Sequence, residues 1–325
     1  MGLKPMAAAG MFLERTYASF DGLQLYVRDY PGPREAKVTV ICIPGLTRNS
    51  RDFDELAPHL ALKYRVLCVD LRGRGKSQYA PDPMTYQPPT YVRDMMALLK
   101  AFSLNRVVLV GTSLGGIIST VLGAVMPTKV LGIVMNDIGP EIDATGLTRI
   151  AAFVARGYSG PTWDAAAEAL LQVDGKIYPD YTHADWLKMA RRRFIEQPDG
   201  SIKNDYDLNL AKPFGNAAQA GSAATSLWPY FLRLTGIPVL AMRGAISDVL
   251  SPETFAKMKQ RMPHIEPYTV PNRGHTPYLD EPTALAAVDD FLARLPSRLS
   301  AGQWLGRAAR QAEFLVRLKL GALPT

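Results

Sequence analysis

Short apolar runs alternate with amphipathic segments over roughly residues 12–140. Residues 91–102 and 114–125 carry apolar side chains at helical spacing, and the second helix is expected to end before Pro127. The runs between and around them are rich in β-branched residues and apolar on both faces, which is typical of buried parallel strands. These runs are Val38–Ile43, Val66–Val69, Val107–Val110 and Leu131–Met135. The alternation predicts βαβ units and an α/β fold with a mostly parallel sheet flanked by helices.

The sequence also predicts elements before this alternating region and after residue 230. Residues 16–20 and 23–30 flank Asp21-Gly22, a pair that suits a tight turn, and so predict an opening hairpin. Farther along, Ser251 followed by Pro252 is a strong helix start. The remaining elements expected after residue 230 are strands at Ile237–Met242 and Ile265–Val270 and a helix at Pro282–Leu295.

The pattern changes between residues 141 and 229. This stretch holds helical patterns at 164–173 and 183–195 but no convincing strand, so it predicts an inserted helical lid. The chain is expected to have four parts. Residues 1–140 form the first part of the α/β core, residues 141–229 a helical lid insertion, residues 230–297 the second part of the core, and residues 298–325 a basic amphipathic C-terminal tail.

Composition and charge indicate what kind of molecule the protein binds. Hydrophobic residues make up 47% of the chain and charged residues 21%, as in ordinary globular proteins. The net charge is +7, but residues from 296 onward contain five basic residues and one acidic residue, which leaves only +3 elsewhere. A nucleic-acid surface spread over the whole protein is therefore disfavoured, and we expect a small-molecule partner.

Cofactor and compartment are predicted from weaker signals. Cys42 and Cys68 lie within strand-like runs and are expected to be core residues, because neither has metal-ligand spacing. We expect no metal and no organic cofactor. No apolar stretch approaches the ~20 residues of a membrane span, and the first residues lack the apolar region of a signal peptide. The sequence predicts a cytoplasmic protein; its oligomeric state stays open.

The candidate nucleophile is Ser113. It lies in Gly111-Thr112-Ser113-Leu114-Gly115, which matches G-x-S-x-G. The motif directly follows a predicted strand and opens a predicted helix, and this context makes it specific. A serine hydroxyl is a poor nucleophile at neutral pH, so it needs a base within hydrogen-bonding distance.

His275 is the candidate base. It follows the last predicted strand, in a glycine-containing loop at the carboxyl edge of the sheet, where Ser113 is also expected. The other three histidines, His59, His183 and His264, are expected at the surface.

A third group must orient the imidazole, and a carboxylate is expected to do so. Asp248 is the preferred candidate, because it follows the strand predicted at 237–242 and gives the chain order Ser, Asp, His. Asp137, which follows the preceding strand, is the rival.

These residues resemble the α/β-hydrolase superfamily, in particular its lidded esterase-like branch. The resemblance covers roughly residues 12–297 and includes Ile43-Pro44-Gly45-Leu46 as well as residues 70–77, which match D-x-R-G-x-G-x-S. It implies an oxyanion hole formed by the backbone N–H groups of Leu46 and Leu114. Many relatives have His-Gly where this chain has Pro44-Gly45, so the support of that loop differs.

The function predicted from the triad and this resemblance is hydrolysis of carboxylic esters with small or medium acyl groups through an acyl-enzyme. Dehalogenases and epoxide hydrolases of this superfamily use an aspartate in place of Ser113 and are disfavoured. The same triad supports hydrolysis of carbon–carbon bonds, enol-lactones or thioesters, and these alternatives stay open. A non-catalytic ligand-binding module on a hydrolase fold is the alternative from a different class.

Two basic segments have competing interpretations. Arg191-Arg192-Arg193 is expected on a solvated helix face, with binding of an acidic substrate as the alternative. The tail places Trp304, Ala308, Ala312 and Leu315 on one helical face, which suits contact with an anionic membrane or another subunit. Docking of the tail onto its own core, or disorder, is at least as well supported by the sequence.

Overall fold

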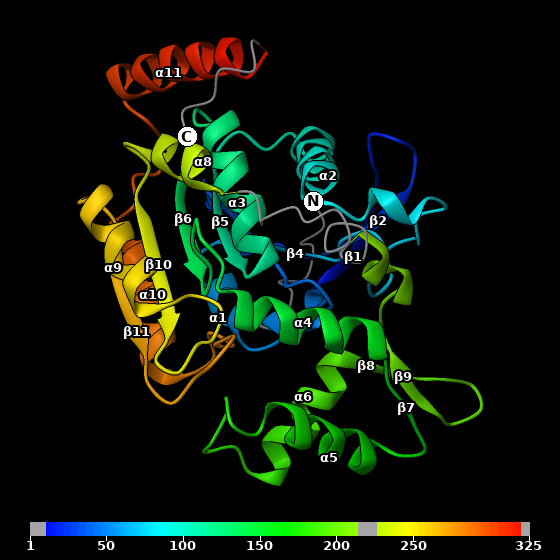
Figure 1. Ribbon diagram of the computed structural model, residues 1–325. Helices are drawn as coiled ribbons and strands as arrows, with labels where there is room; N and C mark the ends of the chain where they lie inside the picture. Colours follow the sequence, from blue (N-terminus) through cyan, green and yellow to red (C-terminus); the bar gives the residue numbers. More distant parts are fainter. Residues whose placement is uncertain (1–10, 214–225, 320–325) are drawn as a thin grey trace.

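An eight-stranded sheet forms the centre of the protein in the computed structural model, which describes residues 11–213 and 226–319 (Figure 1). The strand order is β1-β2-β4-β3-β5-β6-β10-β11; β2 is antiparallel to both of its neighbours, and all pairs from β4 to β11 are parallel. The mostly parallel α/β sheet predicted from the sequence is therefore confirmed. The strands are β1 (Leu13–Ala18), β2 (Gln24–Tyr30), β3 (Thr39–Ile43), β4 (Arg65–Val69), β5 (Val107–Thr112), β6 (Val130–Asn136), β10 (Val239–Gly244) and β11 (Glu266–Val270).

Helices cover both faces of this sheet. Successive strand residues point to opposite faces, so Ile41 and Ile43 join one apolar cluster while Val40 and Cys42 join the other. The first cluster packs against α2 (Pro88–Ala101), α3 (Leu114–Val125), α8 (Trp228–Phe231) and α9 (Pro252–Arg261). The second packs against α1 (Leu56–Ala61) and α10 (Pro282–Arg294). The 3₁₀ helices are η1 (Ser50–Phe53), η2 (Pro83–Thr85), η3 (Leu208–Ala211) and η4 (Leu232–Leu234).

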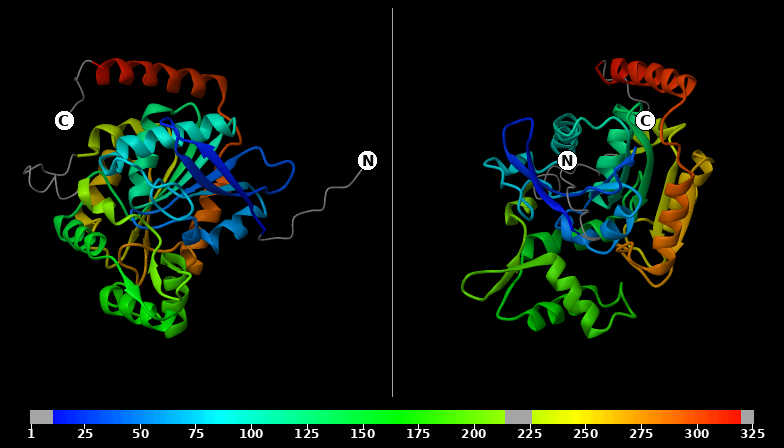
Figure 2. Two further views of the ribbon diagram at one scale, coloured as in Figure 1. Left: turned by 90° about the vertical axis from the view of Figure 1, so that its right-hand side faces the viewer. Right: turned by 180° about the vertical axis from the view of Figure 1, so that it is seen from behind.

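The elements from α4 to β9 build a separate layer, with α5 and α6 at the end of the molecule opposite α11 (Figures 1 and 2). Its helices are α4 (Ala144–Arg156), α5 (Trp163–Asp174) and α6 (His183–Arg193). A small antiparallel sheet of β7 (Ser159–Gly160), β9 (Ile202–Asn204) and β8 (Phe194–Glu196) accompanies them. The expectation that this region has no strand is therefore wrong. The strands were not predicted because they are too short to produce an alternating pattern.

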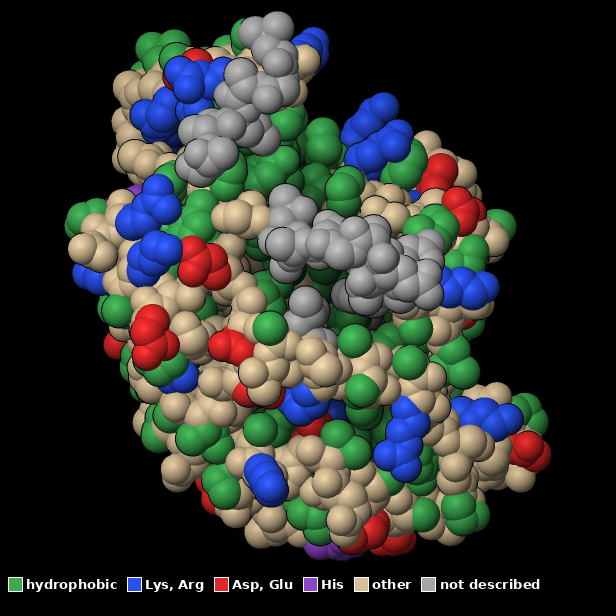
Figure 3. Space-filling model, in the orientation of Figure 1, with side chains coloured by type: hydrophobic (Ala, Val, Ile, Leu, Met, Phe, Trp, Pro, Cys, Tyr) green, Lys and Arg blue, Asp and Glu red, His purple; other side chains and the backbone are tan. Residues whose placement is uncertain are grey.

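The C-terminal helix α11 (Ala301–Lys319) packs on the core of its own chain. Phe314 is buried, and the buried Arg307 donates hydrogen bonds to the carbonyl oxygens of Pro127, Val130 and Gly236. Trp304, placed by the sequence on the interacting face, is instead 50% exposed. Basic side chains lie on α11 at the top of the face in Figure 3. No helix within the described residues has the length and apolar character needed to cross a bilayer.

Arg307 is expected to hold α11 in place, because its removal takes a hydrogen-bond donor from three carbonyl groups, two of which belong to the buried residues Pro127 and Val130. Arg307→Met should lower the free energy of opening of α11 by about 1–3 kcal/mol. Hydrogen exchange of residues 301–319 measures this opening. Arg310→Met, which changes an exposed arginine of the same helix, is the matched control and should leave the exchange unchanged. Equal exchange in the two variants would contradict the anchoring role.

Candidate active site

Ser113 lies in a sharp turn between β5 and α3. Its backbone has φ 51° and ψ −113°, in the left-handed half of conformational space that non-glycine residues seldom adopt. Neighbouring glycines allow this turn to pack closely. A Cβ on Gly111 would lie 2.3 Å from the carbonyl oxygen of Gly115, and a Cβ on Gly115 would lie 2.0 Å from that of Ile43. The turn therefore requires glycine at both positions and places the serine side chain at the carboxyl edge of the sheet.

His275 meets Ser113 across 162 residues of sequence: its Nε2 lies 2.9 Å from the Ser113 Oγ. Residues of the insertion hold the histidine loop from the other side. The Gly274 N–H donates to the carbonyl of Ile177 at 2.7 Å, and the Tyr178 hydroxyl donates to the carbonyl of Thr276 at 2.7 Å. The structure thus brings together the serine and histidine singled out in the sequence, and it adds two anchors that the sequence did not indicate.

The carboxylate that contacts His275 is Asp137, which directly follows β6. Its Oδ2 lies 2.8 Å from the His275 Nδ1, and it also accepts hydrogen bonds from the Gly244 N–H (2.9 Å) and the Ser247 hydroxyl (2.7 Å). These donors compensate the complete burial of the carboxylate. With Nδ1 protonated and donating to Asp137, Nε2 is free to accept the Ser113 hydroxyl hydrogen.

Asp248, the acid preferred from the sequence, does not occupy this position. It forms a two-point ion pair with Arg149 of α4, at 2.6 and 2.8 Å. Burial alone would raise the pKa of Asp248, but the Arg149 guanidinium holds it below the ordinary value. The stabilisation from this pair is therefore present at neutral pH and is lost only as the pH falls through that lowered pKa. The prediction is corrected: β6 and β10 are neighbours, and the acid after β6 is the one that reaches the imidazole.

The two backbone N–H groups expected to bind an oxyanion come from the residue after Ser113 and from the loop after β3. Leu114 is the first residue of α3, so its N–H has no partner within the helix, and Leu46 lies in the loop after β3. Neither N–H donates a hydrogen bond to any residue within the described ranges. Both donors are thus available to a ligand.

Arg74 supplies the loop support that was in question at Pro44-Gly45. Its buried guanidinium donates from Nε to the carbonyl oxygen of Leu46 at 2.7 Å, and from Nη1 to the carbonyl of Arg72 and the hydroxyl of Tyr91. The D-x-R-G-x-G-x-S segment therefore has a physical role here, because its second arginine fixes the peptide next to the candidate oxyanion donor.

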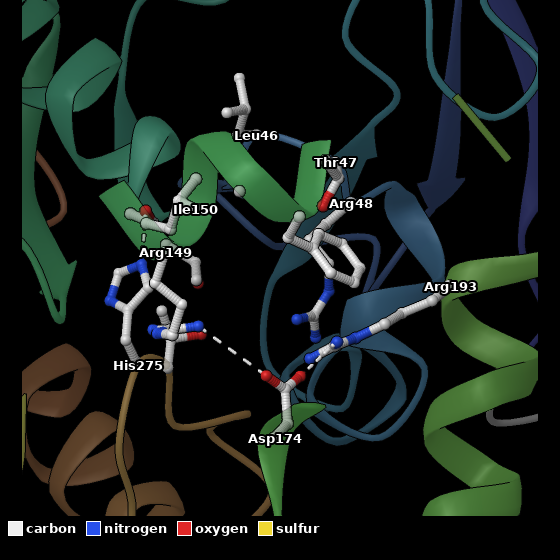
Figure 4. A pocket seen from close by; sticks show the side chains of 13 residues that line it. Leu46, Thr47, Arg48, Arg149, Ile150, Asp174, Arg193 and His275 are labelled. Carbon is white, nitrogen blue, oxygen red and sulfur yellow. Dashed lines mark hydrogen bonds and ion pairs between the residues drawn. The ribbon is translucent and has the colours of Figure 1, made fainter. Parts of the chain in front are cut away.

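A pocket of about 550 Å³, its open mouth included, joins these groups. The sheet side contributes Ser113, His275 and the loop after β3, while the insertion contributes α4 and the ends of α5 and α6. The lining residues are Gly45, Leu46, Thr47, Arg48, Thr112, Ser113, Arg149, Ile150, Phe153, Asp174, Arg193, His275 and Thr276 (Figure 4).

The arginine triplet at the end of α6 is not a solvated face. Arg191 is exposed, but Arg192 and Arg193 are only 5% and 7% exposed. Arg193 pairs with Asp174 of α5 at 2.6 Å and lines the pocket, whereas Arg192 pairs with Asp280. The expectation of a solvated helix face is therefore wrong for Arg192 and Arg193. The sequence pattern did not indicate their burial, because their carboxylate partners are not neighbours along the chain.

Comparison with known proteins identifies the family. The family model described as the alpha/beta hydrolase fold matches residues 38–282, which is most of the chain. The chain belongs to the α/β-hydrolase family. The resemblance noted in the sequence is thereby confirmed at the level of the family and its fold.

Two named relatives of this α/β-hydrolase, and one solved structure, are described as hydrolases. The chain is 35% identical to the 3-hydroxybutyrate-oligomer hydrolase of Cupriavidus necator, over 78% of this chain and 87% of that protein. It is 29% identical to the 2-(acetamidomethylene)succinate hydrolase of Mesorhizobium japonicum, over 76% and 85% of the two chains. The solved structure of an α/β hydrolase from Novosphingobium aromaticivorans is 44% identical, has a TM-score of 0.83, and is matched over 89% of this chain and 100% of that one.

Replacing each candidate acid by its amide tests the observed hydrogen-bond chain. We expect Asp137→Asn to slow labelling of Ser113 by a fluorophosphonate roughly a hundredfold or more, because the amide no longer holds the imidazole in the required tautomer. Asp248→Asn, the matched control, should slow it less than about tenfold. The reverse order of effects would return the acid role to Asp248.

Arg74 should affect the rate of reaction more than the binding of substrate. Arg74→Met frees the carbonyl of Leu46, so kcat for a p-nitrophenyl ester should fall roughly tenfold or more with little change in KM. Arg74→Lys, which retains one donor and the charge, should recover part of the loss. A proportional fall in the amount of folded enzyme, with kcat per active site unchanged, would show a purely structural role.

Proposed function

We propose that this α/β-hydrolase is a serine hydrolase that cleaves carboxylic esters with small or medium acyl groups. The observation that carries the proposal is the continuous hydrogen-bond chain from Ser113 through His275 to Asp137. The two free N–H groups beside it and the pocket in front of it support the same chemistry.

The reaction follows from this geometry. The Ser113 oxygen attacks the ester carbonyl while His275 takes the hydroxyl proton, and the charge on the resulting imidazolium is stabilised by Asp137. The N–H groups of Leu46 and Leu114 hold the tetrahedral oxyanion. The bond to the alcohol oxygen then breaks as His275 returns the proton to that oxygen, which leaves an acyl-enzyme. Water then attacks the acyl carbon while His275 takes its proton; the bond to the Ser113 oxygen breaks as His275 returns the proton to that oxygen, which releases the acid and the free serine.

We further propose that residues 141–229 act as a lid on this site. Five of the pocket-lining residues, Arg149, Ile150, Phe153, Asp174 and Arg193, belong to this insertion. The pocket therefore exists only where insertion and core face each other. Such a site limits access of water to the acyl-enzyme and sets the size of the acyl group.

The name of the Cupriavidus relative makes esters of 3-hydroxybutyrate the first substrates to test. Thioesters, enol-lactones and vinylogous diketones belong in the same panel, since the same triad supports their hydrolysis. A non-catalytic binding module would bind members of the panel without cleaving them.

Native protein is expected to hydrolyse the esters, and Ser113→Ala is expected to lose at least roughly a thousandfold in kcat. Ser159→Ala, a change at an exposed serine in β7, is the control and should retain native activity. Steady-state hydrolysis monitored by pH-stat, together with fluorophosphonate labelling, provides the measurement. Hydrolysis that survives in Ser113→Ala would refute the proposal. A much larger kcat/KM for a thioester, lactone or diketone would replace the ester by that class.

A further inference from the structure

Three arginine side chains line the pocket that contains Ser113. Arg48 comes from the loop after β3, Arg149 from α4 and Arg193 from the end of α6. Among the pocket-lining residues in the described part of the chain, Asp174 is the one with an acidic side chain. In Figure 4 the guanidinium groups of Arg48 and Arg193 converge beside the Asp174 carboxylate. A pocket that must accept only a neutral ester has no need of this arrangement.

Arg48 is held firmly but is not fully hydrogen-bonded. Its Nε donates to Asp52 at 2.8 Å, and its guanidinium lies 4.4 Å from the ring centre of Tyr278. Its Nη2 is enclosed and has no hydrogen-bond partner among the described residues. An enclosed guanidinium nitrogen without an acceptor is costly, so this position calls for an acceptor from outside the chain.

Arg193 is placed against the same space. Its Nη1 donates to Asp174 at 2.6 Å and its Nε donates to the Tyr278 hydroxyl at 3.3 Å. Burial and, after it, the charge of Arg193 act to lower the pKa of Arg48, whereas Asp52 raises it, and the net shift is upward. Arg48 therefore stays charged although a like charge lies nearby. An anion placed between the two guanidinium groups would interact favourably with both.

Arg149 differs from the other two arginines. Two of its nitrogens are already bound to both oxygens of Asp248. Its remaining nitrogen lies 3.8 Å from Asp174. Arg149 is thus tied to Asp248 at two points, and among the three pocket arginines the enclosed nitrogen without a partner belongs to Arg48.

The stem of Arg48 is close to Ser113. A Cβ placed on Gly45 would lie 3.4 Å from the Arg48 Cγ and 3.8 Å from the Ser113 Cβ, so the Arg48 stem and the serine flank the same glycine. Because Ser113, Arg48 and Arg193 line one pocket, a ligand whose carbonyl carbon lies at Ser113 can extend toward the two arginines.

We propose that Arg48 and Arg193 form a carboxylate-binding subsite, and that the substrates are esters that also carry a free carboxylate group. The planar guanidinium matches the two oxygens of a carboxylate, and the ion pairs to Asp52 and Asp174 hold the two groups ready before substrate arrives. The inference rests on the proposed function, because it takes Ser113 as the attacking group. It specifies the class of ester that reacts with Ser113, namely esters that carry a free carboxylate.

The test compares the linear dimer of 3-hydroxybutyrate, which has a free carboxylate, with the methyl ester of the same dimer, which has none. For native enzyme, kcat/KM for cleavage of the internal ester should be at least roughly tenfold higher with the acid. In Arg48→Met this acid-to-methyl-ester ratio should fall roughly tenfold or more. Arg191→Gln, which changes the exposed arginine of the same triplet, is the matched control and should leave the ratio at its native value.

Arg193 needs a compensated variant, because removing it alone leaves Asp174 buried and unpaired. The double variant Arg193→Gln with Asp174→Asn avoids this charge, and its melting temperature shows whether it folds. It too should lower the ratio. If Arg48→Met and the double variant melt like native enzyme and keep the native ratio, the subsite proposal is overturned. If the double variant does not fold, Arg48→Met decides.

Calorimetry separates failure of the subsite from failure of the proposed function. Free 3-hydroxybutyrate should bind to Ser113→Ala, and its affinity should fall roughly tenfold or more when Arg48→Met is added. The methyl ester of 3-hydroxybutyrate should bind more weakly, and its affinity should change less when Arg48→Met is added. If the panel shows no ester hydrolysis, the proposed function fails, yet this binding difference still supports the anion subsite. If esters are cleaved but the acid binds no better than its methyl ester, the subsite fails alone.

Discussion

The site depends on one imidazole held between two side chains that are distant in sequence. His275 contacts Ser113 and Asp137, which are 162 and 138 residues away along the chain. Such an arrangement survives only if the backbone fixes all three positions. Ser113 and Asp137 follow neighbouring strands, β5 and β6, and both have positive φ. The parallel register of those strands therefore sets the distance between Ser113 and Asp137, and the loop after β11 has only to place the His275 ring between them.

That loop is stabilised from outside the sheet. The bonds from Gly274 to Ile177 and from Tyr178 to Thr276 link it to the insertion. Tyr178 is itself packed among Tyr181, Trp186 and Tyr278, in an apolar cluster separate from those of the sheet. The folding of the insertion and the position of the histidine are thus coupled. The layer that lines the pocket therefore also holds His275 in place.

The fold, and the contact between Ser113 and His275, were predictable because their signals are local. Buried parallel strands are recognised by their own β-branched residues, and Ser113 by glycines within a few positions. The carboxylate partner of His275 was not predicted, because the sequence favoured Asp248, whereas Asp137 follows the adjacent strand β6 and is the one in contact. What separates them is three-dimensional: a positive φ at Asp137 and the N–H of Gly244 on the neighbouring strand. Burial of Arg193 was missed for the same reason, since its partner Asp174 lies on another helix.

The position of the acid has a consequence for the rest of the pocket. Because Asp137 occupies the place beside His275, the carboxylate of Asp248 is not needed there and pairs with Arg149 instead. That pair fixes α4 against the loop after β10, and Asp174 with Arg193 fixes α5 against α6. Each of these ion pairs is partly or fully buried. Because burial of two charges costs desolvation free energy, the pairs contribute little to the net free energy of folding and mainly fix the position of each guanidinium. The carboxylates around this pocket therefore act mainly as supports for arginines, and the arginines present the polar surface that an anionic substrate would meet.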